Sequence, residues 1–347
     1  MYLNQLVLAG LALCGSALAS PTPAKRADEK VGYLSVYWTT DDESVYFALS
    51  DNDDPLGFAA INSGNAVVSP TLGTKAVRDT SIIAGQGDDA GKYWIIGTDL
   101  NIGEVSFLTH ILIARGADRQ TTWDAAVRTG SRAIYVWEST DLVNWSENTL
   151  VTVEDSTAGM VWAPDAIWDP EQGQYFVHWA SRFYAADDTD HTGDATTGNV
   201  LRYAYTSDFK TFGEPQDYIV GTTDVIDLCL IQLDSNTLLR SYVNSSSADG
   251  LPVEISTNGL LGDWSLLGSI ADSAGYEAPY FFADNTGGGK GYMTADLVGS
   301  SPGISGWTSE DLSSGVLTKD TSHDLTFMRH DSVLAVTQSQ YDALKAM

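Results

Sequence analysis

The chain has 347 residues, and its 18 Lys and Arg residues against 46 Asp and Glu residues give a formal net charge of −28. A charge this negative repels phosphate, which argues against a nucleic-acid binder or a protein that docks on anionic lipid membranes. Apolar residues make up 43% of the chain, far more than in a disordered acidic protein, so we expect a large folded core.

The N-terminal segment predicts secretion. Residues 1–19 have the form of a signal peptide, because a short apolar run ends in the small-x-small pattern Ala17-Leu18-Ala19. The run is too short to span a bilayer. Lys25-Arg26 then predicts a dibasic processing site, which makes residues 20–26 a pro-segment. We expect residues 27–347 to form a secreted, extracellular monomer.

Beyond residue 30, short runs rich in Val, Ile, Tyr and Trp alternate with Gly, Asp, Asn and Ser turns, which predicts an all-β protein. One phrase recurs: a strand, then Ser/Thr-x-Asp/Asn, an apolar residue and an aromatic residue. It reads YVWESTDLVNW at 135–145, YAYTSDFKTF at 203–212, VEISTNGLLGDW at 253–264 and, more weakly, SGWTSEDLSSG at 305–315. Two further short strands precede each phrase, so four units share one order of strands.

A fifth unit is divided between the two ends of the chain. MRHDSVLAV at 328–336 has the form of a first strand, whereas residues 32–40 and 44–58 have the form of second and third strands. Joining the ends predicts a five-bladed β-propeller closed by pairing of the N- and C-terminal strands, as one domain over residues 27–347. The alternative is a two-sheet sandwich.

The first strand of each blade lines the channel of a propeller, so residues at the starts of these strands should converge. Aligning the first strands brings together Asp79, Asp165, Asp227, Glu277 and His330. A single Asp at a strand start is ordinarily a turn residue. Four carboxylates together, however, drive their pKa values apart, which yields the protonated acid and the ionised base that glycoside hydrolysis needs. An inverting pair is separated by about 6.5–9.5 Å, which non-adjacent blades could provide.

The phrases VRDTSII, VWAPDAIWD, VIDLCLI, YEAPYFF and RHDSVLAVTQSQYDAL, in this order, resemble glycoside hydrolase family 43, the five-bladed arabinanases, arabinofuranosidases and β-xylosidases. The resemblance implies that Asp79 is the general base and Glu277 the general acid. It also implies that Asp227 is the third carboxylate, which raises the pKa of the acid and orients it.

The same resemblance assigns the surroundings of the acids. It implies that Asp165 and Trp162 line the sugar pocket, and that His330 holds water or a structural calcium ion near the axis, with no other cofactor required. Arg329 would either bind a sugar hydroxyl or balance the acids. The sequence departs from the family pattern at three positions: Thr80 and Leu228 replace prolines, and Ala278 replaces a glycine.

The substrate follows from the branch of the family. The run TGSRAIYVWESTDLVNWSE with HTGD at 191–194 most resembles the exo-acting α-L-arabinofuranosidases. We therefore expect an inverting hydrolase that releases arabinose from α-1,5-linked arabinan or arabino-oligosaccharides, with plant cell-wall arabinan or arabinoxylan as its partner. The alternatives are an endo-arabinanase, a β-xylosidase, an inactive sugar-binding propeller, and a retaining invertase-type propeller, whose Asn-Asp-Pro-Asn-Gly phrase is absent.

Aromatic residues offer sugar-stacking candidates, because axial C–H groups of sugars pack well on indole rings. The candidates are Trp38, Trp94, Trp123, Trp162 and Trp179. Most aromatics of a propeller wedge between blades, so only Trp162, three residues before Asp165, is favoured as a sugar contact.

Overall fold

The structure is a computed structural model that describes residues 29–103, 122–221, 223–245, 250–270, 275–299 and 302–347. The expected signal peptide (1–19) and pro-segment (20–26) lie outside the described residues. Within these ranges, no helix has the length and apolar character needed to cross a bilayer.

The described strands form five antiparallel sheets of four strands each. We number these sheets as blades in the order of their inner strands around the ring. From inner to outer strand, blade 1 contains β20 (Arg329–Thr337), β1 (Lys30–Trp38), β2 (Tyr46–Asp51) and β3 (Ala59–Ala60). Blade 2 contains β4 (Val77–Ala84), β5 (Tyr93–Asp99), β6 (Ala133–Ser139) and β7 (Thr149–Thr152). Blade 3 contains β8 (Trp162–Asp169), β9 (Gln174–Ser181), β10 (Val200–Thr206) and β11 (Gln216–Ile219). Blade 4 contains β12 (Val225–Gln232), β13 (Leu238–Asn244), β14 (Leu251–Ser256) and β15 (Ser265–Ile270), and blade 5 contains β16 (Tyr276–Ala283), β17 (Gly291–Leu297), β18 (Gly303–Ser309) and β19 (Thr318–Lys319).

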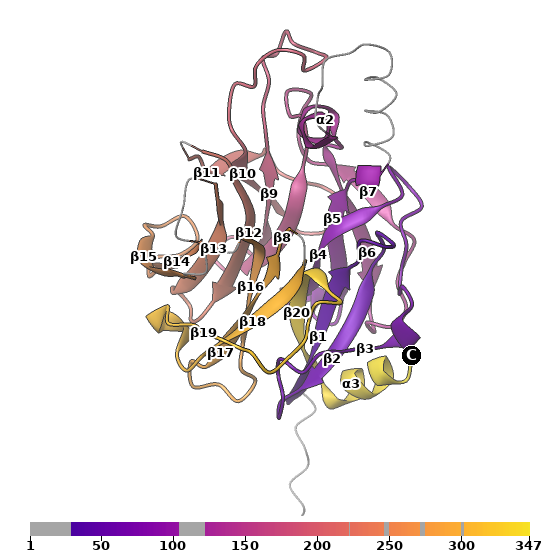
Figure 1. The fold of residues 1–347 in the computed structure, drawn as a ribbon, viewed down its shortest axis with the longest axis vertical. Helices are drawn as coiled ribbons and strands as arrows, with labels where there is room; N and C mark the ends of the chain where they lie inside the picture. Colours follow the sequence, from indigo (N-terminus) through magenta and orange to yellow (C-terminus); the bar gives the residue numbers. More distant parts are fainter. Residues whose placement is uncertain (1–28, 104–121, 222, 246–249, 271–274, 300–301) are drawn as a thin grey trace, which may run out of the picture.

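The five inner strands form a closed ring. β4 contacts β8, β8 contacts β12, β12 contacts β16, β16 contacts β20, and β20 contacts β4 (Figure 1). The predicted five-bladed propeller is confirmed.

Blade 1 closes the ring as predicted. β1, from the N-terminal part of the chain, pairs with β20, from the C-terminal part, and Leu34 lies opposite Leu334. Directly after β20, helix α3 (Gln338–Lys345) begins with a capping box between Thr337 and Gln340 and packs on β1. The N-terminal and C-terminal parts of the chain are therefore joined in one blade, which closes the ring.

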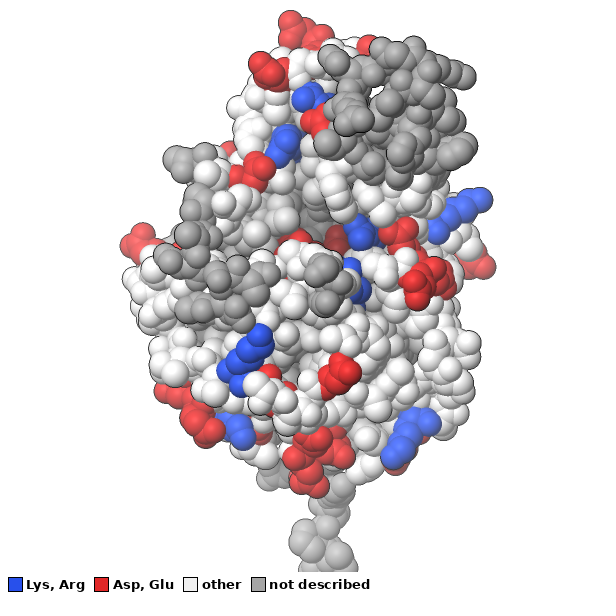
Figure 2. Space-filling view, viewed as in Figure 1, with Lys and Arg blue, Asp and Glu red and all other residues white. Residues whose placement is uncertain are grey.

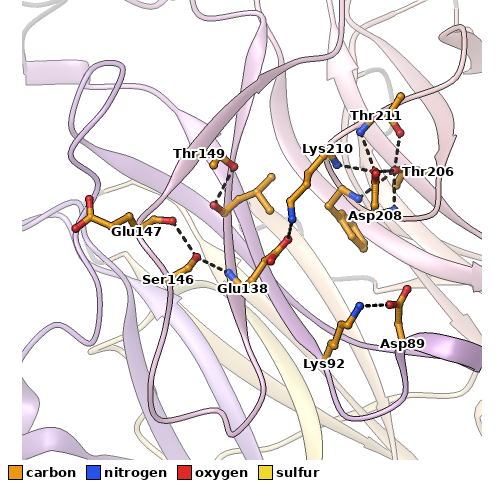
Figure 3. Close-up of polar contacts among 12 residues, drawn as sticks. Asp89, Lys92, Glu138, Ser146, Glu147, Thr149, Thr206, Asp208, Lys210 and Thr211 are labelled. Atoms are coloured by element: carbon orange, nitrogen blue, oxygen red, sulfur yellow. Dashed lines mark hydrogen bonds and ion pairs between the residues drawn. The ribbon is translucent and has the colours of Figure 1, made fainter.

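The recurrent Ser/Thr-x-Asp/Asn phrase is a turn stabilised by its own side chains. After β10, Asp208 Oδ1 accepts hydrogen bonds from the backbone N–H groups of Lys210 (2.9 Å) and Thr211 (2.8 Å), as Figure 3 shows. Asp141 plays the same part after β6. The Lys210 ammonium also lies 2.7 Å from Glu138 Oε1 on β6, so this turn joins blade 3 to blade 2. The repeat is thus set by a local side-chain-to-backbone turn.

The core is divided into five apolar clusters, each between neighbouring blades. Trp94 and Trp179 belong to the cluster between blades 2 and 3, and both rings are buried. Their faces pack between the sheets, as the sequence favoured for every stacking candidate except Trp162. Trp38 is also almost fully buried.

Two eight-residue α-helices lie in the described part of the chain, although the sequence pattern predicted only strands and turns. Helix α2 (Thr122–Thr129) lies between β5 and β6, and α3 follows β20. The two helices lie toward opposite ends of the molecule (Figure 1). Short 3-10 turns occur at Asn62–Gly64, Gly87–Asp89 and Leu312–Ser314.

On the face in Figure 2, acidic side chains form several separate groups, with fewer basic side chains between them.

Candidate active site

Each inner strand is interrupted near its start by a bulge. At each bulge one non-glycine residue adopts a left-handed conformation: Asp79 (φ 51°), Ala163 (48°), Asp227 (55°), Ala278 (52°) and His330 (36°). A non-glycine residue pays about 1–3 kcal/mol for such a conformation, which persists only where the surroundings impose it and is frequent at active sites. The five strained positions therefore mark one level of the ring as the candidate site.

The bulges correct the sequence alignment in two blades. Asp165 lies two residues after the left-handed Ala163, so it is level with Ser81 on β4, further along the channel, and is only 7% exposed. Glu277 lies one residue before Ala278. The expectation of four acids in register is therefore wrong, because only Asp79 and Asp227 occupy the left-handed position that the five bulges share.

Asp79 is held as an ionised carboxylate. Its Oδ1 lies 3.1 Å from His330 Nδ1, and its Oδ2 accepts a hydrogen bond from Thr98 Oγ1 at 2.8 Å. Burial is the largest single influence and raises the pKa of Asp79, but the charge and hydrogen bond of His330, the charge of Arg78 and the hydrogen bond of Thr98 together outweigh it, so the pKa lies below its ordinary value. Burial likewise opposes the charge of His330, yet Asp79 raises the pKa of His330 to about 9. Both groups are thus charged at neutral pH.

Thr98 connects this carboxylate to the next blade. Its Oγ1, while donating to Asp79, accepts a hydrogen bond from the Ala163 backbone N–H at 2.8 Å. Thr98 is fully buried on β5. The bulge of blade 3 and the carboxylate of blade 2 are therefore fixed through one hydroxyl.

Glu277 has the opposite protonation state. Burial, followed by the nearby Asp227 carboxyl, raises the pKa of Glu277 to about 8. Burial also raises the pKa of Asp227 to about 6, and Asp227 Oδ2 accepts a hydrogen bond from the Ala278 backbone N–H at 3.1 Å. The Glu277 side chain keeps 35% of its surface exposed, so a substrate can reach it. At neutral pH Glu277 carries a proton that Asp79 lacks.

Arg329 balances the acids rather than pairing tightly with Glu277. Its Nε donates to both carboxylate oxygens of the fully buried Asp296, at 2.9 and 2.6 Å, whereas its Nη2 lies 3.8 Å from Glu277 Oε1. Asp296 also accepts the His330 backbone N–H at 3.3 Å. Because Asp296 compensates most of the Arg329 charge, Glu277 can remain protonated. A contact of Arg329 with a sugar hydroxyl stays a prediction.

Two guanidinium groups, those of Arg78 and Arg329, lie against the Trp38 ring beside the carboxylates. The Trp38 ring lies 4.1 Å from the Arg78 guanidinium carbon and 5.3 Å from that of Arg329. Arg78 Nε in turn lies 3.2 Å from Glu43 Oε1. The sequence alone did not place Arg78, Glu43, Thr98 or Asp296 in the site. Of these four residues, only Arg78 could have been found from the sequence, because it directly precedes Asp79 just as Arg329 directly precedes His330.

The expected calcium ion near His330 does not fit the residues as they lie. Ca²⁺ takes about 6–8 oxygen ligands, but the oxygens of Asp79 are held by His330 and Thr98, and those of Asp296 by Arg329. Across the described ranges, no group of three or more His, Cys, Asp and Glu side chains is arranged to hold a metal. The calcium ion stays a prediction.

A closed propeller that presents one ionised and one protonated carboxyl group at its axis has the layout of a carbohydrate-cleaving enzyme. The chain belongs to the glycoside hydrolase 43-related family, since the family model described as "Probable glycosyl hydrolase domain" matches residues 28–342.

Individual relatives are similar over parts of their length. An α-L-arabinofuranosidase of Bifidobacterium longum is 32% identical over 200 residues, which is 53% of this chain but only 17% of that protein. Among solved structures, a thermostable family-43 glycoside hydrolase is 17% identical over 72% of this chain and 73% of that chain, with a TM-score of 0.47. An arabinanase of Bacillus subtilis is 16% identical over 77% of this chain and 82% of that chain, with a TM-score of 0.45. The five-bladed fold follows from the strand pairing of this chain.

Proposed function

We propose that this chain is a secreted, inverting exo-α-L-arabinofuranosidase that releases arabinose from α-1,5-linked arabinan or arabino-oligosaccharides. The observation that carries the proposal is the pair of carboxyl groups with opposite protonation, Asp79 on β4 and Glu277 on β16. β20 lies between these two strands in the ring. The spacing by one strand favours inversion, because an inverting pair must leave room for a water molecule between the base and the sugar.

In the proposed reaction Glu277 donates its proton to the glycosidic oxygen as the bond to the anomeric carbon breaks. Asp79 accepts a proton from a water molecule whose oxygen bonds to that carbon from the opposite face. His330 keeps Asp79 ionised before the reaction, and Asp227 helps to keep Glu277 protonated. Asp79 then releases its proton to solvent and Glu277 takes one up from solvent, which restores the starting protonation states.

Arabinose is supported as the substrate sugar by the identity of the Bifidobacterium longum relative, which is named as an α-L-arabinofuranosidase. The chain spans only a small part of that protein, so the substrate is part of our proposal. Secretion rests on the expected signal peptide, and we propose that the secreted protein begins near Ala27, which N-terminal sequencing of secreted material tests.

The test is turnover of purified protein on linear arabinan, arabino-oligosaccharides, xylan and sucrose, with products separated by size. We expect arabinose as the first product from arabinan and its oligosaccharides. Asp79→Asn and Glu277→Gln, which keep the side-chain shapes, should each lower kcat by about 10²–10⁴-fold while the circular dichroism spectrum stays unchanged.

Other products would indicate one of the alternative activities. Oligosaccharides as first products indicate endo action, and xylose release indicates a xylosidase. If the wild-type protein releases no sugar from any substrate, the enzymatic proposal is wrong.

A further inference from the structure

A pocket of about 370 Å³ opens between α2, blade 3 and the segment before β12. Its lining includes Trp123, Asp124, Trp162, Arg182, Asn199 and Asp224. The sequence offered Trp123 and Trp162 as stacking candidates and favoured only Trp162, and it assigned no role to the other four residues.

One side of the pocket is aromatic. The ring centroids of Trp123 and Trp162 are 6.0 Å apart and the rings are nearly perpendicular. Trp123 is 51% exposed, although an indole side chain is ordinarily well buried. An indole face left open beside a second indole is a suitable platform for the C–H face of a sugar ring.

The other side is polar and held rigidly. Arg182 donates from Nε to Asn199 Oδ1 and from Nη2 to Asp224 Oδ2, both at 2.8 Å. The Asn199 backbone N–H donates to Asp224 Oδ1 at 2.7 Å. A guanidinium has five N–H donors and these contacts use two. The planar groups therefore form a fixed frame with donors and acceptors suited to pairs of hydroxyl groups.

Helix α2 is braced, so Trp123 is presented at a fixed place. Arg128, in the last turn of α2, donates from Nη1 to the backbone carbonyls of His191 (3.0 Å) and Gly193 (2.7 Å). Its Nε also pairs with Asp124 at 3.0 Å. These contacts attach α2 to the loop between β9 and β10.

The charges at the pocket favour a neutral ligand. Arg182 is paired with Asp224 at 2.8 Å and Arg128 with Asp124 at 3.0 Å, so these two cations and two anions compensate one another. A phosphate or carboxylate would meet as many negative charges as positive ones. A polyhydroxylated neutral molecule meets no uncompensated charge.

The pocket adjoins the carboxylates. Trp162 directly precedes Ala163, whose N–H is held by the same Thr98 hydroxyl that binds Asp79. On the other side, the guanidinium of Arg78, the residue before Asp79, lies 5.6 Å from the Trp123 ring centroid. A chain of linked sugars bound at the carboxylates can therefore continue into the pocket.

We infer that this pocket is a second sugar-binding subsite, which holds a neutral sugar residue linked to the one cleaved at the carboxylates, with Trp123 as its stacking platform and Arg182 as its hydroxyl-binding group. This subsite rests on the proposed function. It makes Trp123 and Arg182 determinants of specificity for oligosaccharides over simple glycosides.

The experiment compares arabino-oligosaccharides with methyl α-L-arabinofuranoside, which has no second sugar. For Trp123→Ala we expect kcat/KM on the oligosaccharide to fall about tenfold, mainly through KM. On the methyl glycoside kcat/KM should stay within about twofold of wild type. Trp123→Phe should recover part of the loss, and Arg182→Lys, which keeps the charge but loses the planar fork, should also raise KM for the oligosaccharide. The matched control is Leu261→Ala, because Leu261 is an exposed apolar residue on blade 4. It should leave kcat/KM unchanged on both substrates.

The outcomes separate the subsite from the proposed function. Suppose that wild type cleaves both substrates. If Trp123→Ala then lowers kcat/KM equally on the two substrates, or leaves kcat/KM unchanged on both, the subsite is wrong and the proposed function stands. If wild type cleaves neither, the function fails, and the subsite is then tested by titrating the protein with arabino-oligosaccharide and following tryptophan fluorescence. A quench that Trp123→Ala abolishes supports the subsite, whereas an unchanged quench or none overturns it.

Discussion

Thr98 is the most informative single position for the general base. The substitution Thr98→Val keeps the side-chain shape but removes the hydroxyl that donates to Asp79 and accepts the Ala163 N–H. The matched control is Thr80→Val. Thr80 is also fully buried in blade 2, but its hydroxyl has no hydrogen-bond partner among the described residues.

The expected pKa change follows from the contacts. A hydrogen bond to a charged group contributes about 1.5–3 kcal/mol, and one pKa unit corresponds to about 1.36 kcal/mol. Thr98 is the smallest of the influences that lower the pKa of Asp79, after His330 and Arg78, and Asp79 keeps 19% of its side-chain surface exposed. We therefore take the lower end and expect the pKa of Asp79 to rise by about 1 unit in Thr98→Val.

The substitution also lowers stability. The Ala163 N–H loses its acceptor in a buried place, which costs about 1–3 kcal/mol of unfolding free energy. A carboxyl whose pKa is lower in the folded state stabilises the protein above its ordinary pKa, and this contribution disappears as the pH falls through the lowered value. Raising the pKa of Asp79 reduces that contribution, so the difference between Thr98→Val and wild type should be larger at neutral pH than in acid.

The assay is the pH dependence of kcat/KM on an arabino-oligosaccharide, with urea unfolding measured in parallel. The acid limb of kcat/KM reports the base of the free enzyme, so it should shift to higher pH by about 1 unit in Thr98→Val. It should not move in Thr80→Val. If the acid limb of Thr98→Val stays in place while its unfolding free energy falls, Thr98 supports the fold only and Asp79 is not the base.

Two further predictions concern the acid and the closure of the ring. Asp296→Asn removes the negative charge that compensates Arg329, so the pKa of Glu277 should fall. The alkaline limb of kcat/KM should then move to lower pH by about 1 unit. If that limb does not move, Asp296 does not raise the pKa of the acid. In Leu34→Ala a fully buried side chain of the β1–β20 pair is lost, which should cost about 2–5 kcal/mol in urea unfolding. The exposed Leu266→Ala should stay within about 0.5 kcal/mol, and equal effects of the two would contradict closure by these strands.

The blades and their closure could be predicted because the signals were local. Asp141 and Asp208 organise the same turn in neighbouring blades through contacts within three residues, so the repeat is visible in the sequence. The strands that close the ring carried the same pattern at the two ends of the chain. The terminal processing expected from residues 1–26 stays a prediction.

The register of the site could not be predicted because the bulges leave no composition signal. Left-handed positions ordinarily favour Gly or Asn, yet here Ala163, Ala278 and His330 occupy them. As a result Asp165 was aligned with Asp79, although it lies further along the channel. The pKa of Asp165 is raised to about 7 by burial, and its expected contact with sugar stays a prediction.

Contacts between blades also could not be predicted from the sequence. Asp296 on blade 5 binds Arg329 on the neighbouring blade 1, and Thr98 on blade 2 joins Asp79 to Ala163 on blade 3. The spacing of these residues along the chain does not suggest such pairs. Trp94 and Trp179 pack between blades, as expected for most aromatic residues of a propeller.

The most direct test of the central claim is the anomeric form of the first product. Proton NMR should follow hydrolysis of an α-L-arabinofuranosyl oligosaccharide by the wild-type protein in its first minutes, before mutarotation. With Asp79 as a base that activates water and Glu277 as the acid, β-arabinofuranose should appear first and convert to the equilibrium mixture. If α-arabinofuranose appears first, the reaction proceeds with retention, and the assignment of Asp79 as a general base is contradicted.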